Sequence, residues 1–518
     1  MSWYLSLPLI LPFATAVIAF LLRDRAIGAW VSVAGSALGL VAAGVLMALV
    51  LDQGIVAGQM GNWPAPFGIT LVADLLSAVM VLITAITALA VAIYALSDVD
   101  MRHGRLGYHA LFQILIAGVT GAFLTGDLFN MYVWFEVMLI ASFGLLIING
   151  GKEQIDAGVK YVALNLISTI LFLTGIGLLY GLTGTLNFAD LALKVEEVEN
   201  QALLTVISMM FMVAFGVKAA AFPVFFWLPA AYHTPSFSVS AVFAGLLTKV
   251  GVYALMRVFT LVFDHDIGYT HTILLWVACF TMVTGVLGAA AQSDFRKILS
   301  FHIISQIGYM ILGLAIYTPL ALVGAVFYLV HHIIVKANLF LIAGISQRLT
   351  GGSDVYKIGG LYKSSPFLAA LFLIPAFSLA GFPPLSGFWA KYIIVKASLD
   401  QGLWIVAFLA LAVGLMTIYS MTKIWAEAFW KPHPDGIEPK LSTLPGRSAL
   451  LIPVIFLAVL TMVIGLMPDP FVTFAERAAE QLLDSTAYIT TVLGEDAMPA
   501  ALPDTGDVPA TENPEVEQ

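Results

Sequence analysis

Fourteen apolar runs, each about as long as a bilayer is thick, constrain this chain more than any other feature of its sequence. A helix needs about 20 apolar residues to cross the hydrocarbon core of a membrane. The runs cover residues 3–22, 27–51, 72–96, 107–126, 128–148, 158–182, 203–222, 236–262, 271–291, 295–315, 319–346, 367–398, 402–430 and 448–468. We therefore predict an all-α polytopic membrane protein of 14 transmembrane helices.

The composition agrees with this prediction and excludes several other classes. Of the 518 residues, 60% are hydrophobic and 11% are charged, whereas a soluble domain is about a quarter charged. The sequence before the first run lacks a basic region and a small-residue cleavage site, so we expect a retained span and not a signal peptide. Cys279 is the one cysteine, which excludes a disulfide framework and a cysteine metal site.

The basic residues give the orientation, because cytoplasmic loops carry an excess of Lys and Arg. Loops after even-numbered runs, with the C-terminal tail, hold Lys194 and Arg477. Loops after odd-numbered runs hold Arg23, Arg25, Arg102, Arg105, Lys152, Arg296, Lys297, Arg348, Lys357, Lys363, Lys431, Lys440 and Arg447. This bias would be lost if a span had been missed, and it places both termini on the outer face.

Two runs contain helix-breaking residues. Run 7 leads into Pro223 and Pro229, and run 12 contains GFPPLSG at 381–387. Interrupted spans in corresponding positions of two halves indicate a transport site. We therefore predict two five-helix repeats, runs 4–8 and runs 9–13, of opposite orientation, with helices 7 and 12 discontinuous at Pro223 and Pro229 and at Pro383 and Pro384.

The expected organisation follows from these repeats. The predicted parts are N-terminal spans (1–106), a first repeat (107–262), a second repeat (263–430), a last span (431–468) and a tail (469–518). In the tail, residues 471–493 could form an amphipathic helix at the outer surface. Residues 494–518 are rich in Pro and acidic residues and are expected to be disordered. The formal net charge of −9 arises in this tail.

Glu136 and Lys218 are the strongest functional candidates. Glu136 is the carboxylate of an apolar run, and Lys218 lies in another run shortly before Pro223. Burial would drive each group alone to its neutral form, but two opposite charges placed together keep each other ionised. Separation of the pair would then release a proton from the lysine. The alternatives are a protonated, hydrogen-bonded Glu136 and a static salt bridge at Lys218.

Further titratable residues lie inside later runs. They are Lys249, His302, His331, His332, Lys336 and Lys391. His332 and Lys336 are four residues apart and share a helix face, and histidine can accept and donate protons near neutral pH. His302 and His331 could instead be packing residues bonded to a carbonyl. We expect Asp74 to cap a helix. Four basic residues near span ends are expected to reach the membrane surface, namely Lys160, Arg257, Lys396 and Lys423.

The sequence lacks the motifs of other membrane chemistries. It contains no GxxxxGK[ST] phosphate loop, no CxxC array and no HExxH pair. We therefore predict no cofactor, no metal site, no nucleic-acid partner and no enzymatic activity.

Five segments carry a resemblance to a known family. They are FNMYVWFEVMLIASFGLL around Glu136, residues 216–255, residues 293–310, HHIIVKANLF from His331 and AGFPPLSGFWAK ending at Lys391. The chain resembles, over roughly residues 1–468, the antiporter-like subunits shared by Mrp-type multisubunit cation/proton antiporters and respiratory complex I. Within that family it is most similar to the D-type subunits of the Mrp antiporters.

The resemblance implies roles for the candidate residues. Glu136 and Lys218 would be the coupled pair, Lys249 the relay in mid-channel and Lys391 the terminal site. His331, His332 and Lys336 would connect the two halves.

The resemblance also implies a setting. The chain would exchange protons for Na⁺, Li⁺ or K⁺ in a bacterial cytoplasmic membrane, with subunits of the A, B, C, E, F and G types as partners. Two alternatives stay open. One is a proton-pumping subunit of a complex I-like or hydrogenase-like redox enzyme, and the other is a scaffold whose buried charges only hold helices together.

Overall fold

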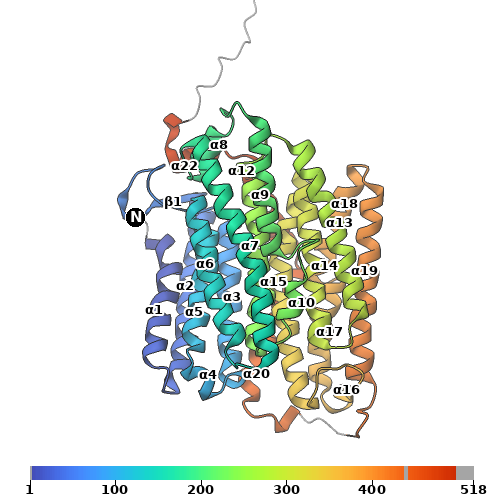
Figure 1. The fold of residues 1–518 in the computed structure, drawn as a ribbon. Helices are drawn as coiled ribbons and strands as arrows, with labels where there is room; N and C mark the ends of the chain where they lie inside the picture. The colour runs from blue at the N-terminus through green and yellow to red at the C-terminus, as the bar shows by residue number, and fades with distance from the viewer. Residues whose placement is uncertain (1–2, 437–440, 498–518) are drawn as a thin grey trace, which may run out of the picture.

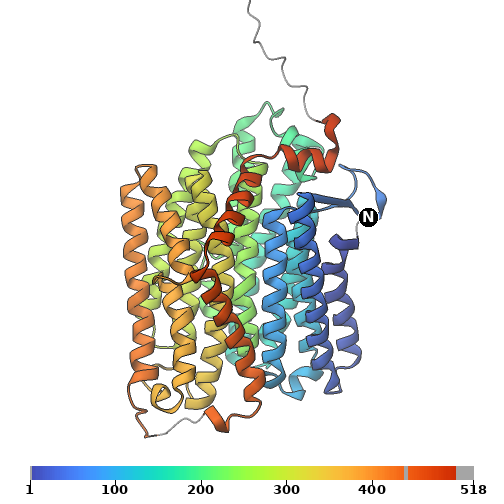
Figure 2. The ribbon, with the colours of Figure 1, turned by 180° about the vertical axis from the view of Figure 1, so that it is seen from behind.

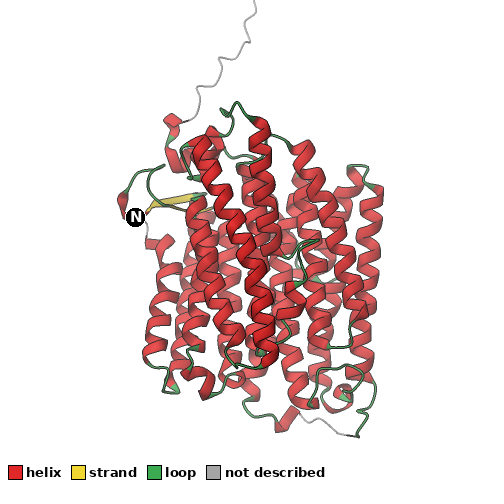
Figure 3. Cartoon of the chain, viewed as in Figure 1, coloured by secondary structure: helices red, strands yellow, loops and turns green. Residues whose placement is uncertain are grey.

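A bundle of long, roughly parallel helices makes up nearly the whole molecule (Figures 1 and 3). The computed structural model describes residues 3–436 and 441–497. Up to the end of α12 the helices are α1 (Trp3–Leu21), α2 (Ile27–Gln53), η1 (Met60–Asn62), α3 (Leu75–Asp98), α4 (Met101–Arg105), α5 (Tyr108–Leu124), α6 (Leu128–Ile147), α7 (Lys152–Thr183), α8 (Phe188–Lys194), α9 (Gln201–Ala219), α10 (Trp227–Ala231), α11 (Phe237–Val242), η2 (Phe243–Leu247) and α12 (Thr248–Leu261). The later ones are α13 (Ile267–Ala291), α14 (Phe295–Ile316), α15 (Pro319–Thr350), α16 (Leu361–Ser364), α17 (Pro366–Ala380), α18 (Ser386–Asp400), α19 (Trp404–Ile424), η3 (Trp425–Trp430), η4 (Leu441–Thr443), α20 (Arg447–Leu466), α21 (Asp469–Leu483), α22 (Thr486–Leu493) and η5 (Glu495–Ala497).

The predicted apolar runs all coincide with helices. Within the described residues, twelve helical stretches are long and apolar enough to cross a membrane, and α5 and α17 are apolar but shorter. Each of the fourteen runs falls on one of these helices or on a helix with its continuation. The prediction of an all-α polytopic membrane protein is confirmed. The number of fourteen spans, the inverted repeats and the domain boundaries stay predictions.

A short β-hairpin was not predicted. β1 (Val56–Gln59) and β2 (Thr70–Ala73) pair antiparallel between α2 and α3. The third apolar run was expected to begin at residue 72, but β2 occupies 70–73 and α3 begins at Leu75. β2 and the first turn of α3 are both mainly apolar. A short apolar stretch has no periodicity that would distinguish a strand from the start of a helix.

The helix interruptions lie where the prolines predict them, with one difference. α9 ends at Ala219, and Ala220 takes the left-handed conformation with φ 60°. Pro223 lies in the irregular segment that follows, but Pro229 lies in the first turn of α10, where a residue without an amide hydrogen is tolerated. The prediction that Pro229 also breaks the helix is therefore wrong. Between α17 and α18, the segment 381–385 contains both Pro383 and Pro384.

One predicted surface residue is instead buried in an ion pair. Asp74 caps α3 by accepting from the amide of Ser77, as expected. Its other oxygen lies 2.6 Å from Nη2 of Arg257 on α12, and the Arg257 side chain is 4% exposed. The prediction that Arg257 reaches the membrane surface is wrong, because Asp74 and the ring of Tyr488 compensate its charge inside the protein.

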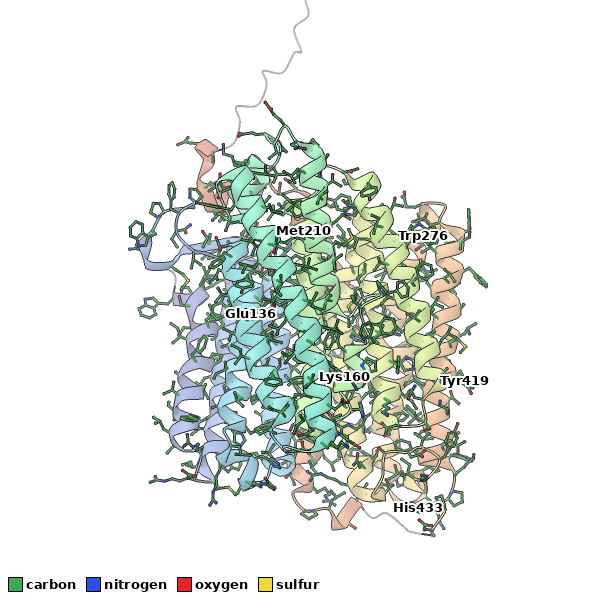
Figure 4. All side chains as sticks on the ribbon, viewed as in Figure 1. Glu136, Lys160, Met210, Trp276, Tyr419 and His433 are labelled. Carbon is green, nitrogen blue, oxygen red and sulfur yellow. The ribbon has the colours of Figure 1, made fainter. Side chains whose placement is uncertain are left out.

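The other three basic residues near span ends are partly or largely exposed. Lys160 and Lys396 each pair with a carboxylate on their own helix, at 2.5 Å from Asp156 and 2.8 Å from Asp400. Lys160 lies toward the α4 end of the bundle (Figure 4). Half-buried Lys423 donates to the carbonyl oxygens of Ala290 and Gln292 at the end of α13.

The C-terminal segment contains two helices where one was predicted. α21 and α22 together cover the predicted stretch 471–493. We expected this stretch at the outer surface, but α21 packs lengthwise on α15 across the back of the bundle, and α22 lies at one end (Figure 2). The alanines at 475, 478 and 479 are buried and allow this close approach. Of the segment predicted to be disordered, residues 495–497 form η5, and 498–518 lie outside the described residues.

The buried pair on α3 and α12 gives a test of what holds the bundle together. Arg257→Met leaves Asp74 ionised and unpaired, which should lower the stability of the folded state by about 3 kcal/mol. The double variant Asp74→Asn, Arg257→Met removes both charges and should lose less. The measurement is the thermal unfolding midpoint of the purified protein in detergent. A double variant as unstable as Arg257→Met would show that packing, and not the unpaired charge, sets the loss.

Candidate functional site

Lys218 lies in the last turn of α9, directly before the helix break, and is 7% exposed. Its Nζ donates to the backbone oxygen of Asn165 at 3.5 Å and to Oγ1 of Thr169 at 3.4 Å, both on α7. The ammonium lies 5.7 Å from the centroid of the Phe135 ring, within reach of the attraction between a cation and an aromatic face. The residue is thus held by uncharged groups.

The break after α9 exposes backbone groups that find partners inside the protein. The indole Nε1 of Trp227 donates to the Val217 carbonyl at 3.0 Å, and the Phe222 amide donates to Oγ1 of Thr281 at 2.9 Å. A cavity of about 20 Å³ lies beside Lys218 and reaches Leu247 on η2. This volume is enough for one water molecule.

Glu136 does not contact Lys218 directly. The Oγ1 of Thr169 donates to Oε1 of Glu136 at 2.6 Å while it accepts from Lys218. A hydroxyl has one donor hydrogen and two acceptor lone pairs, so both bonds can form at once. Glu136 lies on α6 near mid-height of the bundle and is partly exposed (Figure 4). The structure therefore brings the predicted pair together through a threonine.

Lys249 is fully buried at the start of α12. Its Nζ donates to the carbonyl of Ala244, five residues earlier. Ala244 belongs to η2, a π-helical segment, in which the backbone bonds run over five residues and the regular i→i+4 ladder is shifted. Within the described residues, no carboxylate pairs with Lys249.

His302, His332 and Lys336 meet where α14 and α15 pack together. Lys336 is fully buried, and its Nζ donates to the Leu299 carbonyl at 3.0 Å. The charge of Lys249 acts on Lys336, and the charge of Lys336 acts on both histidines, so the four groups lie in one region of the interior. Both ring nitrogens of His302 and of His332 are buried without a hydrogen-bond partner in the described part of the chain.

Lys391 and His331 lie at the break between α17 and α18. The Nζ of Lys391 donates at 3.0 Å to the carbonyls of Leu379 and Ala380, which end α17. His331 Nδ1 lies 2.8 Å from the hydroxyl of Ser386, the first residue of α18. The unpaired carbonyls at a helix end carry partial negative charge, so the break itself holds the amine.

These residues form a row of groups that can bind and release protons. An amine that donates to carbonyls keeps acceptors for its hydrogens in both protonation states. From Lys249 through the histidines to Lys391, neighbouring groups lie within reach of one another's charge, and no hydrogen bond between them is found among the described residues. Between Lys218 and Lys249 no side-chain contact joins the described residues, and the cavity at Leu247 occupies that gap. Among the described residues, no group of three or more His, Cys, Asp or Glu could hold a metal ion.

Three hydroxyl residues of the site escaped the sequence analysis. Thr169 bridges Glu136 and Lys218, and Ser378 bonds to Ser386 at 2.9 Å beside His331. Most hydroxyls in helices bond to a carbonyl of their own helix, as Thr84 and Thr87 do here. The sequence carried no signal that separates the bridging hydroxyls from these.

The comparisons with known proteins show the family to which the chain belongs. The family model for NADH:quinone oxidoreductase/Mrp antiporter transmembrane proteins matches residues 125–417. This chain belongs to that family. A curated relative from Alkalihalophilus pseudofirmus, the D-type subunit of a Na(+)/H(+) antiporter, is 46% identical over 94% of this chain and 99% of its own length.

Two solved structures share the fold of this family member. A chain of the Mrp complex from Dietzia sp. DQ12-45-1b superposes with a TM-score of 0.87 at 34% identity, covering 95% of this chain and 100% of that one. A chain of respiratory complex I from Thermus thermophilus gives 0.77 at 25% identity, covering 93% and 100%. The protein is a multi-pass membrane protein of a bacterial membrane and a transporter-type subunit.

The packing around Lys218 can be tested through Gly251 on α12. A Cβ at Gly251 would lie 2.5 Å from the amide nitrogen of Ala219 and 2.8 Å from the carbonyl carbon of Lys218. Gly251→Ala should therefore push α12 away from the break and lower the thermal unfolding midpoint, at a cost of about 1–3 kcal/mol. Gly177→Ala on α7, which has open space around it, is the matched control. Equal stability of both variants would contradict the close packing.

Proposed function

We propose that this chain is the D-type subunit of a multisubunit cation/proton antiporter and that it carries protons through its interior in exchange for Na⁺ or a related monovalent cation. One observation carries the proposal: a row of buried amines and imidazoles extends between two helix breaks. A buried charge inside a membrane lowers the stability of the folded protein. A row of ionisable groups of which Lys218 alone is coupled to a carboxylate therefore indicates a functional role.

The first step uses Glu136, Thr169 and Lys218 as a unit. With Thr169 donating to the carboxylate and accepting from the ammonium, the negative charge favours the protonated amine across one hydroxyl. When the bridge opens, Lys218 loses that support, because desolvation then favours the neutral amine. The proton leaves toward the cavity that Leu247 lines. Lys249 follows Leu247 by two positions in the sequence.

The middle of the path uses imidazoles between two amines. His332 lies in the field of Lys249 and Lys336, and His302 lies in the field of Lys336 and Lys391. Their buried ring nitrogens have no partner among the described residues, and water normally satisfies such groups. Because like charges repel, protonation of one amine opposes protonation of the next. A proton that arrives at Lys249 thus favours release of a proton from Lys391.

The end of the path is Lys391, next to His331 and the two serines of the α17–α18 break. The carbonyls of Leu379 and Ala380 stabilise the protonated amine there. From this break the proton would leave to one side of the membrane. The route of the cation is an open question of this proposal, and a partner subunit is one candidate, because no group of three or more His, Cys, Asp or Glu among the described residues could hold a metal ion.

The setting of the protein follows from its relatives. A chain similar to the D-type subunit of a Na(+)/H(+) antiporter and to a chain of an Mrp complex would work with the A-, B-, C-, E-, F- and G-type subunits. We place it in the bacterial cytoplasmic membrane with both termini on the outer face, because of the distribution of Lys and Arg in its loops.

A redox-driven proton pump is the second candidate. The fold shared with a chain of respiratory complex I favours it, although identity is lower there than to the antiporter relatives. An iron–sulfur cluster or flavin that co-purifies with the complex, or adjacent genes for quinone-binding subunits, would decide for the pump.

The main test measures cation-driven proton movement with all partner subunits present. Glu136→Gln and Lys218→Ala should abolish the dissipation of a pH gradient by added Na⁺, Li⁺ or K⁺ in membrane vesicles, because each removes one charge of the coupled unit. Lys160→Ala, which removes an exposed lysine paired with Asp156, is the control and should transport normally. If Glu136→Gln and Lys218→Ala lower the unfolding temperature but leave transport intact, the pair is structural and the proposal fails.

Thr169 gives a second, sharper prediction. Thr169→Val keeps the shape but removes the hydroxyl that joins Glu136 to Lys218, and hydrogen bonds to charged groups contribute about 1.5–3 kcal/mol. The transport rate should fall about tenfold or more. Thr169→Ser restores the hydroxyl and should retain most of the rate. If valine and serine variants transport equally, the hydroxyl does not couple the pair.

A further inference from the structure

One face of α21 is charged although it lies on the outside of a membrane bundle. Asp469, Glu476, Arg477 and Glu480 are exposed, and their spacing puts them on one side of the helix. The opposite side, with Ala475, Ala478, Ala479 and Leu482, is buried against the protein. We call the exposed residues Asp469, Glu476, Arg477 and Glu480 the charged face of α21.

The position of α21 is fixed at both ends. Just before it, the Gly465 carbonyl accepts from Nε1 of Trp389 at 2.9 Å, and a Cβ on Gly465 would lie 2.6 Å from the Pro384 oxygen. Pro384 belongs to the break between two 15-residue helices, α17 and α18, so α21 begins near the middle of the bundle.

The other end of α21 lies where α3 begins. The side chain of Gln481 accepts from the amide of Leu75, the first residue of α3, at 2.9 Å. Figure 2 shows α21 rising along the back of the bundle between these two levels. Half of a 30 Å hydrocarbon core is about 15 Å, and the seven residues from Asp469 to Glu476 rise about 10 Å. Asp469 and Glu476 therefore lie at hydrocarbon depth.

Neighbouring surfaces on the same side have the composition that lipid requires. On α20 the exposed side chains include Ile452, Phe456, Val459 and Val463. On α21, by contrast, none of the four residues of the charged face forms an ion pair within the described part of the chain. Ionised groups that face hydrocarbon without partners are rare because they are costly.

We propose that the charged face of α21 is the docking surface for a transmembrane helix of a partner subunit that presents Lys or Arg side chains at the depth of Asp469 and Glu476. The proposal rests on the proposed function in one respect, namely that the chain works inside a multisubunit assembly. Charge selects the partner: three carboxylates against one guanidinium leave the face negative, and a negative face is complementary to a basic helix. A second copy of this chain would bring the same excess of carboxylates to the contact.

Cross-linking in the complete complex tests the proposal directly. A benzophenone amino acid replaces Glu476 or Glu480, and in the control it replaces Val459 on the apolar face of α20. After irradiation of native membranes, the probes at 476 and 480 should couple to another subunit of the complex, at a membrane-spanning peptide that contains Lys or Arg. The probe at 459 should not give this product. Coupling at 476 and 480 to lipid alone, or to a second copy of this chain, would overturn the proposal.

Charge reversal provides an independent readout. Glu476→Lys with Glu480→Lys should reduce the amount of partner subunits that co-purify with this chain by about tenfold, because like charges would then meet. Glu199→Lys, in an exposed loop, is the matched control and should leave co-purification unchanged. Unchanged co-purification of the double variant would also overturn the proposal.

The two proposals fail in different ways. An assembled wild-type complex that moves no protons in response to cations would end the proposed function, while the cross-links to a basic partner helix would still form. Normal transport without such cross-links would end the docking proposal alone.

Discussion

The hydrogen bonds from buried lysine amines to backbone carbonyls are the interaction on which the rest of this structure depends. Lys249 bonds to a carbonyl of a π-helical segment and Lys391 to the last carbonyls of α17. For Lys249 and Lys391 these carbonyls lie where the regular helix ladder is interrupted, whereas Lys218 and Lys336 donate to carbonyls of the continuous helices α7 and α14. In hydrocarbon such interruptions are stable only inside protein. Of the irregular segments, η2 is fully buried, whereas the breaks at α9–α10 and α17–α18 are exposed at Pro223 and at residues 382–384.

Close helix packing makes these interruptions possible. Gly251 lets α12 touch the backbone at Lys218 and Ala219, and Gly387 lies so near the Ser378 carbonyl that a Cβ there would be 1.8 Å from it. Hydroxyls then complete the hydrogen bonding that the carbonyls leave open, as Thr169 does between a carboxylate and an ammonium. The polar interior is thus assembled from small residues and single hydroxyls, with long side chains reaching into it from several helices.

Much of this architecture could be predicted from the sequence, because lipid imposes simple rules on a chain. Length and apolarity located the helices, and Pro223, Pro383 and Pro384 marked the breaks. The ionisable residues of the site were visible because charge is rare in such runs. The bridging role of Thr169 was not visible, since a hydroxyl that spans two helices has the same local sequence as one that bonds to its own. The burial of Arg257 was missed for a similar reason: its partner Asp74 lies 183 positions earlier in the chain.

The π-helical segment η2 carries a mechanical consequence. It contains one residue more per turn than an α-helix, directly before Lys249. A change of this turn to α geometry would rotate everything that follows by about 100° about the helix axis. Such a register slip would swing the amine of Lys249 away from Ala244 without unfolding α12. The rotation would also break the ion pair of Arg257 with Asp74 and the bond from Tyr253 to the Phe123 carbonyl, so the partners of α12 oppose this change and hold the π-helical turn in place.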